Sequence, residues 1–303
     1  MSSKDPKNQT NTVTQEDGVS RFVIESCDVR GHIVHLDKTW SIARGRMKYP
    51  AVIQGMLGEA FAATVLLSST IKFEGKLTLQ VRGPGPVHLL VIQVTNEGRI
   101  RGLARWDTLP ADDSLMALFS DAARMTISVE ADALGQPHQG IVELVGDNIS
   151  QALRNYFYTS EQLDTELYLA ANDSTAAGML LQRLPGSTAG PEGWTRAVEL
   201  AKTITGEELL QLDSPTLLHR LYHQEEVRLF DKTPIEFECS CSRERTDGVI
   251  QGLGEPEANS ILAEEGSISI TCEFCAEQYN YDAVDVTTLF LSSVTAEHPS
   301  TRH

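Results

Sequence analysis

Four cysteines in the last quarter of the chain are the residues with the clearest potential for chemistry. They form two close pairs separated by thirty residues, Cys239-Ser-Cys241 and Cys272-Glu-Phe-Cys275. Two pairs of thiolates joined by a loop can supply the four soft ligands of a tetrahedral zinc site. All eight histidines lie outside residues 232–290, so a mixed cysteine–histidine site is not favoured. The spacing therefore predicts one zinc ion bound through all four cysteines.

The first pair is unusual because a single spacer residue separates its cysteines, whereas common zinc fingers use about two to four. Its two sulfurs are therefore close together, and within each pair they are the nearest partners for a disulfide once the metal leaves. Zinc thiolates remain nucleophilic, and exposed ones are oxidised first. From spacing alone, an oxidation-sensitive site and an inert structural zinc site are equally compatible with the sequence.

Outside the two pairs, the sequence offers no convincing catalytic constellation. Cys27 stands alone near a predicted strand, where a small buried residue is favoured over a nucleophile. His219 and His223 lie four apart on a predicted helix, but Arg220 follows His219 where a zinc protease has Glu. A solvated helix face is therefore favoured for these histidines. We predict that the protein is not an enzyme.

The charge of the chain restricts its partners. Its 42 acidic and 25 basic residues give a formal net charge of −17 over 303 residues. Residues 232–285 contain three basic residues and twelve carboxylates, which gives a net charge of −9. Such a surface repels nucleic acid and anionic membranes, and favours protein partners such as basic or unfolded chains. This disfavours one alternative, a zinc-ribbon nucleic-acid or transcription module.

A second alternative, a thiol-disulfide oxidoreductase, needs an exposed dithiol at a helix start near a βαβ unit. The sequence around Cys272 predicts no such unit. The first residues are polar and lack the apolar core of a secretory signal, and the apolar run at 62–67 is too short to cross a bilayer. We therefore expect a cytoplasmic protein, where cysteines are more often metal ligands or redox sensors than structural disulfides.

The pattern of apolar residues predicts an α+β protein. Two strands at 21–26 and 31–36, and a hairpin at 76–82 and 87–94 around the turn Gly83-Pro-Gly-Pro86, are the first strands of a mostly antiparallel sheet. A helix begins at Pro50 between them, and it carries one apolar face through Leu57, Ala60, Phe61, Thr64 and Leu67. We predict a core domain at 20–184, a helical linker at 185–231, and a small cysteine module at 232–290. Polar tails are expected at 1–19, predicted to be disordered, and at 291–303.

The predicted linker is amphipathic. It follows a stretch rich in Pro, Gly and small polar residues, and it carries apolar residues at helical spacing, among them Trp194, Val198, Leu217 and Leu221. Helices this short are marginal by themselves in water. They should therefore pack on the core domain or on the cysteine module.

The chain resembles the redox-regulated 33 kDa chaperones, the heat-shock protein 33 family. The resemblance rests on the two cysteine pairs with their long spacer and on independent stretches of the core. It covers residues from about 20 to 290 and includes Phe237-Glu-Cys-Ser-Cys-Ser-Arg-Glu-Arg245, Lys72-Phe-Glu-Gly-Lys-Leu-Thr-Leu-Gln80, Tyr156-Phe-Tyr-Thr-Ser-Glu-Gln162 and Leu181-Gln-Arg-Leu-Pro185. One departure is His138, where the family leads us to expect Tyr.

This resemblance implies a function. The reduced protein would bind one zinc through the four cysteines and be inactive. Peroxide with mild unfolding, or hypochlorite, would form the disulfides Cys239–Cys241 and Cys272–Cys275 and release the zinc. The module and the linker would then lose structure. The released apolar faces of the linker, with Trp194, Val198, Leu217 and Leu221 as candidates, would bind unfolded client proteins without ATP, so that aggregation is prevented. The reduced form is expected to be a monomer and the oxidised form a homodimer.

Overall fold

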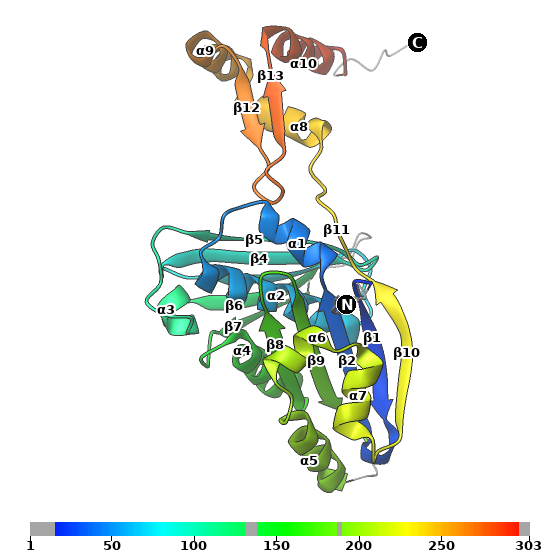
Figure 1. The fold of residues 1–303 in the computed structure, drawn as a ribbon. Helices are drawn as coiled ribbons and strands as arrows, with labels where there is room; N and C mark the ends of the chain where they lie inside the picture. Colours follow the sequence, from blue (N-terminus) through cyan, green and yellow to red (C-terminus); the bar gives the residue numbers. More distant parts are fainter. Residues whose placement is uncertain (1–15, 131–137, 187–189, 297–303) are drawn as a thin grey trace, which may run out of the picture. The chain divides into compact units, whose positions relative to one another are not determined.

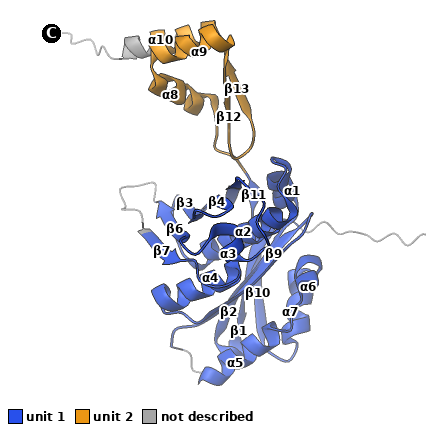
Figure 2. Cartoon of the chain, turned by 90° about the vertical axis from the view of Figure 1, so that its left-hand side faces the viewer, with its two compact units in different colours: residues 1–237 blue, residues 238–303 orange. Residues whose placement is uncertain are grey.

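The computed structural model describes residues 16–130, 138–186 and 190–296. The chain folds into two compact units, residues 1–237 and residues 238–303 (Figures 1 and 2). Strands and helices are mixed in both, which confirms the predicted α+β class. In the first unit, the strands are divided between two sheets.

The first sheet of unit 1 is antiparallel, with strand order β10-β1-β2-β9-β8. A short 3-10 turn, η1 (Glu25–Cys27), joins its first two strands. The strands are β1 (Gly18–Ile24), β2 (Val29–Leu36), β8 (Thr165–Ala171), β9 (Ala176–Arg183) and β10 (Val227–Pro234). Strands β1 and β2 confirm the first predicted pair, while β10 joins them from about two hundred residues further along.

The second sheet has the order β11-β5-β4-β3-β6-β7 and is antiparallel except for the short β11–β5 pair. Its strands are β3 (Lys76–Arg82), β4 (Val87–Thr95), β5 (Arg99–Trp106), β6 (Arg124–Glu130), β7 (His138–Glu143) and β11 (Glu236–Phe237). The predicted hairpin is confirmed as β3 and β4. Helix α3 (Leu115–Phe119) lies against its turn, where a Cβ on Gly85 would come within 2.5 Å of the Phe119 backbone.

Helix α2 (Ala51–Thr70) contacts strands of both sheets and begins one residue after the predicted start at Pro50, which is its N-cap (Figure 1). Its length and composition would suit a membrane span, but 67% of that window is buried inside the fold. The sequence predicted one apolar face through Leu57, Phe61 and Leu67. Residues on the opposite side, such as Ala62 and Leu66, are buried as well, because a sheet covers each side of the helix.

Three further helical elements complete the core of unit 1. Helix α1 (Lys38–Gly45) buries Trp40 against Phe61, and the Trp40 indole donates to the carbonyl of Asn172 at 2.8 Å. Helix α4 (Ile149–Tyr156) is capped by Asn148 and continues into the π-helical turn η2 (Phe157–Glu161).

Helices α5 (Gly190–Ala201), α6 (Gly206–Gln211) and α7 (Ser214–Tyr222) pack on the first sheet, on the face opposite α2. Their apolar residues form one cluster with those of β1, β2 and β9. The pattern Ser214-Pro215 predicts Ser214 as the cap of α7, with Pro215 at the first helical position. Asp213 is the cap instead, and it accepts from the Thr216 N–H at 2.7 Å. The linker helices therefore pack on the first unit, which was one of the two expected supports.

Unit 2 is small. It contains α8 (Arg243–Leu253), α9 (Glu255–Glu265), the hairpin β12 (Ile268–Thr271) and β13 (Gln278–Tyr281), and α10 (Ala283–Ala296). Among the side chains that the structure describes in this unit, five are buried in its apolar core, which are Ile250, Ala258, Ile268, Tyr281 and Val286. An apolar core this small contributes little free energy of folding to unit 2.

The predicted division into core domain, linker and module stays a prediction. Near its boundaries, the structure adds detail. Residues 18 and 19 belong to β1, and α10 extends to Ala296, so parts of both predicted tails are ordered elements. Strand β10 spans the predicted boundary at 231 and pairs with β1. Residues 1–15 and 297–303 lie outside the described residues.

Candidate metal centre

The structure brings the four predicted cysteines together. The sulfur atoms of Cys239, Cys241, Cys272 and Cys275 all lie within 4.8 Å of one another. The Cys239–Cys272 and Cys241–Cys275 sulfurs are 3.6 and 3.3 Å apart. Four thiolates about 2.3 Å from a central zinc ion are about 3.8 Å from each other. The cluster therefore fits a tetrahedral thiolate site.

Two different local structures present the cysteines. Cys239 and Cys241 lie between β11 and α8, and Ser242 caps that helix through its side-chain bond to the Arg245 N–H. Cys272 and Cys275 lie in the tight turn of the β12–β13 hairpin. This turn is closed by hydrogen bonds from the Cys272 N–H to the Glu277 carbonyl and from the Ala276 N–H to the Cys272 carbonyl, both 2.8 Å.

Burial and crowding of the sulfurs oppose their ionisation. Burial is the main cause of a raised pKa at both Cys272 and Cys275. Hydrogen bonds with the other three thiols add to the shift at Cys275, whereas at Cys272 the bond with Cys239 adds to the shift and the bond with Cys275 opposes it. Backbone N–H groups of the turn act in the other direction, those of Cys275 and Phe274 on Cys272 and that of Glu277 on Cys275. Donors already point at the sulfurs, so the remaining requirement for four thiolates is a cation among them.

Tyr279 contacts the cysteine cluster, and the sequence reasoning assigned it no role there. Its hydroxyl donates to the Cys241 sulfur at 3.2 Å from β13. A donor outside the ligand set orients the sulfur and reduces its negative charge. Alternation along β13 was a signal that could have found it, because Tyr279 and Tyr281 point to the same side of a strand that follows the second cysteine pair. Arg245 makes a further outer contact, from Nη1 to the Ser240 hydroxyl at 2.8 Å.

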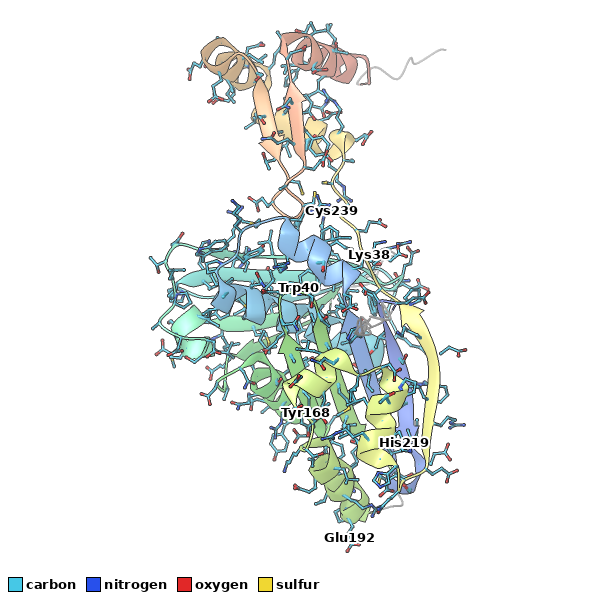
Figure 3. The ribbon with its side chains drawn as sticks, in the orientation of Figure 1. Lys38, Trp40, Tyr168, Glu192, His219 and Cys239 are labelled. Carbon is cyan, nitrogen blue, oxygen red and sulfur yellow. The ribbon has the colours of Figure 1, made fainter. Side chains whose placement is uncertain are left out.

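The four client-binding candidates lie in unit 1, on α5 and α7, and are separate from the cysteine cluster in the chain. Leu217 and Leu221 are buried in the apolar cluster between these helices and the first sheet, and Trp194 packs against it half-buried. Val198 is buried too, but lies outside that cluster. His219 and His223, on α7 and directly after it, are exposed, as expected for a solvated helix face (Figure 3).

Cys27 is fully buried, as predicted for a thiol that is not a ligand. Its sulfur lies 3.4 Å from Arg196 Nη2 and 3.6 Å from Glu225 Oε2. Arg196 pairs with Glu225 through Nε and Oε1 at 2.7 Å, and this joins α5 to the start of β10. Burial and the Glu225 carboxylate raise the pKa of Cys27, which keeps it a thiol.

Fold and site together define an α+β protein with a four-cysteine cluster, able to hold a metal ion, in a small C-terminal unit. Comparison with known proteins gives the particular family. The sequence model described as "Hsp33 protein" matches residues 17–282. The chain belongs to the Hsp33 family, and it is a chaperone rather than an enzyme.

Several relatives bear the name "33 kDa chaperonin". That of Nitrosococcus oceani is 43% identical over 291 residues, which cover 96% of this chain and 100% of the relative. That of Shewanella frigidimarina is 44% identical over 278 residues, with 91% and 96% covered. The crystal structure of a 33 kDa chaperonin from Thermotoga maritima has the same fold, with a TM-score of 0.78 at 21% identity, over 93% of this chain and 100% of that one.

Proposed function

We propose that this chaperone is an ATP-independent holdase that a thiol switch activates under oxidative stress. The observation that carries the proposal is the cluster of four sulfurs within 4.8 Å, held by a unit with five buried core residues. A metal cross-link is the strongest interaction available to such a unit, and oxidation of its ligands would remove that interaction.

In the reduced state, Cys239, Cys241, Cys272 and Cys275 would hold one zinc ion. The donor set supports zinc, because four cysteine sulfurs in tetrahedral arrangement are typical of structural zinc sites. Bound zinc would supply the cross-link between the start of α8 and the β12–β13 turn. In small zinc-dependent peptides, metal binding contributes about 10–16 kcal/mol to folding.

In the oxidised state, we propose the disulfides Cys239–Cys241 and Cys272–Cys275. Each forms when two thiols lose two protons and two electrons, and one hydrogen peroxide molecule accepts these and becomes two waters. Each of the two short sulfur–sulfur contacts, at 3.6 and 3.3 Å, joins a cysteine of the first pair to a cysteine of the second. The reduced geometry therefore does not favour disulfides within each pair. Proximity in sequence and the family resemblance support them instead.

Unfolding of the module would then act on unit 1 through the chain. Cys239 comes two residues after β11, which pairs with β5, and β10 precedes β11 and forms the edge of the first sheet. Loss of these edge strands would weaken the attachment of α5–α7, which directly precede β10. We propose that release of these helices exposes Trp194, Val198, Leu217 and Leu221 to unfolded clients.

Release would also uncover the sheet beneath the helices, which the sequence reasoning did not include. Phe22, Ile24 and Met179 face α5–α7 and are fully buried in the same apolar cluster. Both sides of the separated surface are apolar, so both could hold exposed segments of a client. We further propose a cytoplasmic protein that is monomeric when reduced and dimeric when oxidised, with no nucleic-acid or membrane partner, supported by its charge of −17.

The test is light scattering of a thermally unfolding client protein. The peroxide-treated, zinc-free protein should suppress scattering and the reduced, zinc-loaded protein should not. On oxidation, each chain should lose one zinc ion and four free thiols, counted before and after treatment. A Cys27→Ser variant is the matched control, because it removes a cysteine outside the cluster and should switch normally. Equal suppression by both redox forms would contradict the switch, and insulin reduction with turnover would favour an oxidoreductase.

A further inference from the structure

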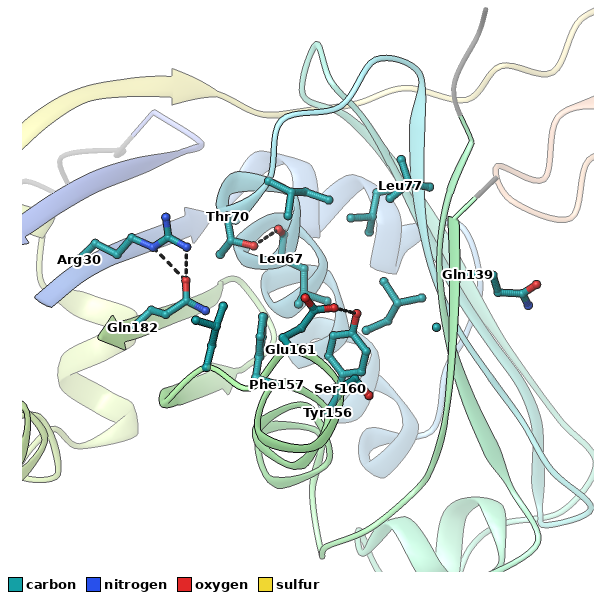
Figure 4. A pocket seen from close by; sticks show the side chains of 15 residues that line it. Arg30, Leu67, Thr70, Leu77, Gln139, Tyr156, Phe157, Ser160, Glu161 and Gln182 are labelled. Carbon is teal, nitrogen blue, oxygen red and sulfur yellow. Dashed lines mark hydrogen bonds between the residues drawn. The ribbon is translucent and has the colours of Figure 1, made fainter. Parts of the chain in front are cut away.

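A cavity of about 340 Å³ lies in unit 1, away from the cysteines (Figure 4). Both sheets contribute to its wall, with Arg30 and Gln182 from the first and Leu77 from the second. The end of α2 and the α4–η2 segment complete it. Most of its lining is apolar, including Leu67, Ile71, Leu77, Ile127, Val129, Phe157 and Leu163. Its volume is within the range of small-molecule sites, about 300–1,000 Å³.

A chain of hydrogen bonds fixes the polar end of the cavity. The Arg30 guanidinium donates to Oε1 of Gln182 through Nε at 2.9 Å and also through Nη2. Gln182 is completely buried, and its Nε2 donates to the Thr165 hydroxyl at 3.0 Å. That hydroxyl donates in turn to the Leu163 carbonyl at 3.2 Å. Each group has a defined direction, so the guanidinium is held in place before any ligand arrives.

The side chain that holds the Arg30 guanidinium in place is neutral. Within the described parts of the chain, its side chain forms no ion pair with a carboxylate, and its fixed partner, Gln182, is neutral. Burial and the neighbouring Arg21 lower the pKa of Arg30. An unpaired, half-buried cation is costly, and a bound anion would relieve this cost with a charge-assisted hydrogen bond.

Glu161 is the carboxylate among the described lining residues, and it does not compensate Arg30. Glu161 is exposed and accepts a hydrogen bond from the Tyr156 hydroxyl at 2.7 Å, on the α4–η2 wall. Solvent screens an exposed carboxylate, whereas the buried side of Arg30 is screened much less. Figure 4 shows Arg30 and Gln182 at one end of the cavity and Leu77 at the other.

We propose that this cavity binds a small monocarboxylate with an apolar body, such as a medium-chain fatty acid. The carboxylate pairs with Arg30, and the chain lies along Leu67, Leu77 and Val129. Charge complementarity and the apolar lining carry the proposal. It is independent of the cysteine switch, because every residue involved lies in unit 1.

The experiment is calorimetric titration of the reduced, zinc-loaded full chain with octanoate and, in parallel, with octan-1-ol. Octanoate should bind with one-to-one stoichiometry and more tightly than the alcohol. Arg30→Gln should weaken octanoate binding roughly tenfold or more, as expected for one hydrogen-bonded charge, with little effect on the alcohol. Val129→Phe should weaken both ligands by filling the apolar part, and thermal unfolding of each variant checks that it is folded.

Arg21→Gln is the matched control. Arg21 lies on the neighbouring strand β1, opposite His32, and is exposed and outside the cavity lining. Its removal takes away the same charge and should change octanoate affinity by less than about twofold because solvent screens it. Three results would overturn the proposal: no octanoate binding at millimolar concentration, equal binding of octanoate and the alcohol, or equal losses in Arg30→Gln and Arg21→Gln.

Discussion

Leu218→Ala separates the docking of the linker helices from the binding of clients. Leu218 lies on α7, is 3% exposed, and belongs to the cluster that holds α5–α7 on the first sheet. It is not one of the four proposed client-binding residues. Truncation of a buried leucine costs about 2–5 kcal/mol, which includes the cavity it leaves. If this free energy is lost from the docking of α5–α7 on the first sheet, the population with undocked helices should rise roughly 30-fold or more, since 1.4 kcal/mol changes an equilibrium constant about tenfold.

Two measurements on the reduced, zinc-loaded variant test this reasoning. Hydrogen exchange in residues 190–222 should become faster, and scattering by an unfolding client should be partly suppressed without any oxidant. Leu109→Ala is the matched control, because Leu109 is 71% exposed and its truncation should change neither quantity. Faster exchange without chaperone activity would refute the idea that undocking exposes the client surface. Unchanged exchange would refute the assigned role of Leu218 in docking.

Three further predictions concern single side chains. Tyr279→Phe removes the hydroxyl that donates to Cys241, so the reduced protein should bind zinc roughly tenfold more weakly in a chelator competition. Burial raises the pKa of Glu59 to about 7, so the ionised carboxylate destabilises the folded state increasingly as the pH rises from about 4.5 to 7. Glu59→Gln should therefore raise the unfolding free energy by about 3 kcal/mol at pH 8 and change it little at pH 4, by urea titration. Burial lowers the pKa of His32 to about 4, so stability present above pH 6.5 is lost as pH falls toward 4. The unfolding free energy should fall by about 2 kcal/mol between pH 7 and pH 5 because of His32, and His32→Leu should remove this fall. If the unfolding free energy of the variant depends on pH as before, the role assigned to His32 is wrong.

Local signals in the sequence were sufficient for many individual elements. Pro50 marked the start of α2, and the turn at Gly83-Pro-Gly-Pro86 marked the β3–β4 hairpin, because these residues constrain the backbone wherever they occur. The N-cap of α7 was misplaced by one residue. Asp213 and Ser214 both suit a cap, and the side chain that reaches a free N–H decides between them.

Long-range pairing could not be predicted from such signals. Strand β10 adds to β1 from about two hundred residues away, and β11 pairs in parallel with β5. The division into two sheets around α2 depends on burial of both sides of that helix, whereas periodicity indicated only one side. The spacing of residues along the chain does not indicate which distant strands become neighbours in a sheet, because this pairing depends on how the whole core packs.

The sequence by itself was sufficient to predict a ligand set for zinc. Two short cysteine pairs, with no histidine in residues 232–290, point to Cys239, Cys241, Cys272 and Cys275, because the two members of each pair cannot be far apart in space. Only the tertiary structure decided what surrounds them and what the linker helices cover. The contact between Tyr279 and Cys241, and the burial of Leu217 and Leu221 against the first sheet, depend on segments that packing brings together. These contacts arise from the way the chain buries its apolar surface as a whole, which no local pattern specifies.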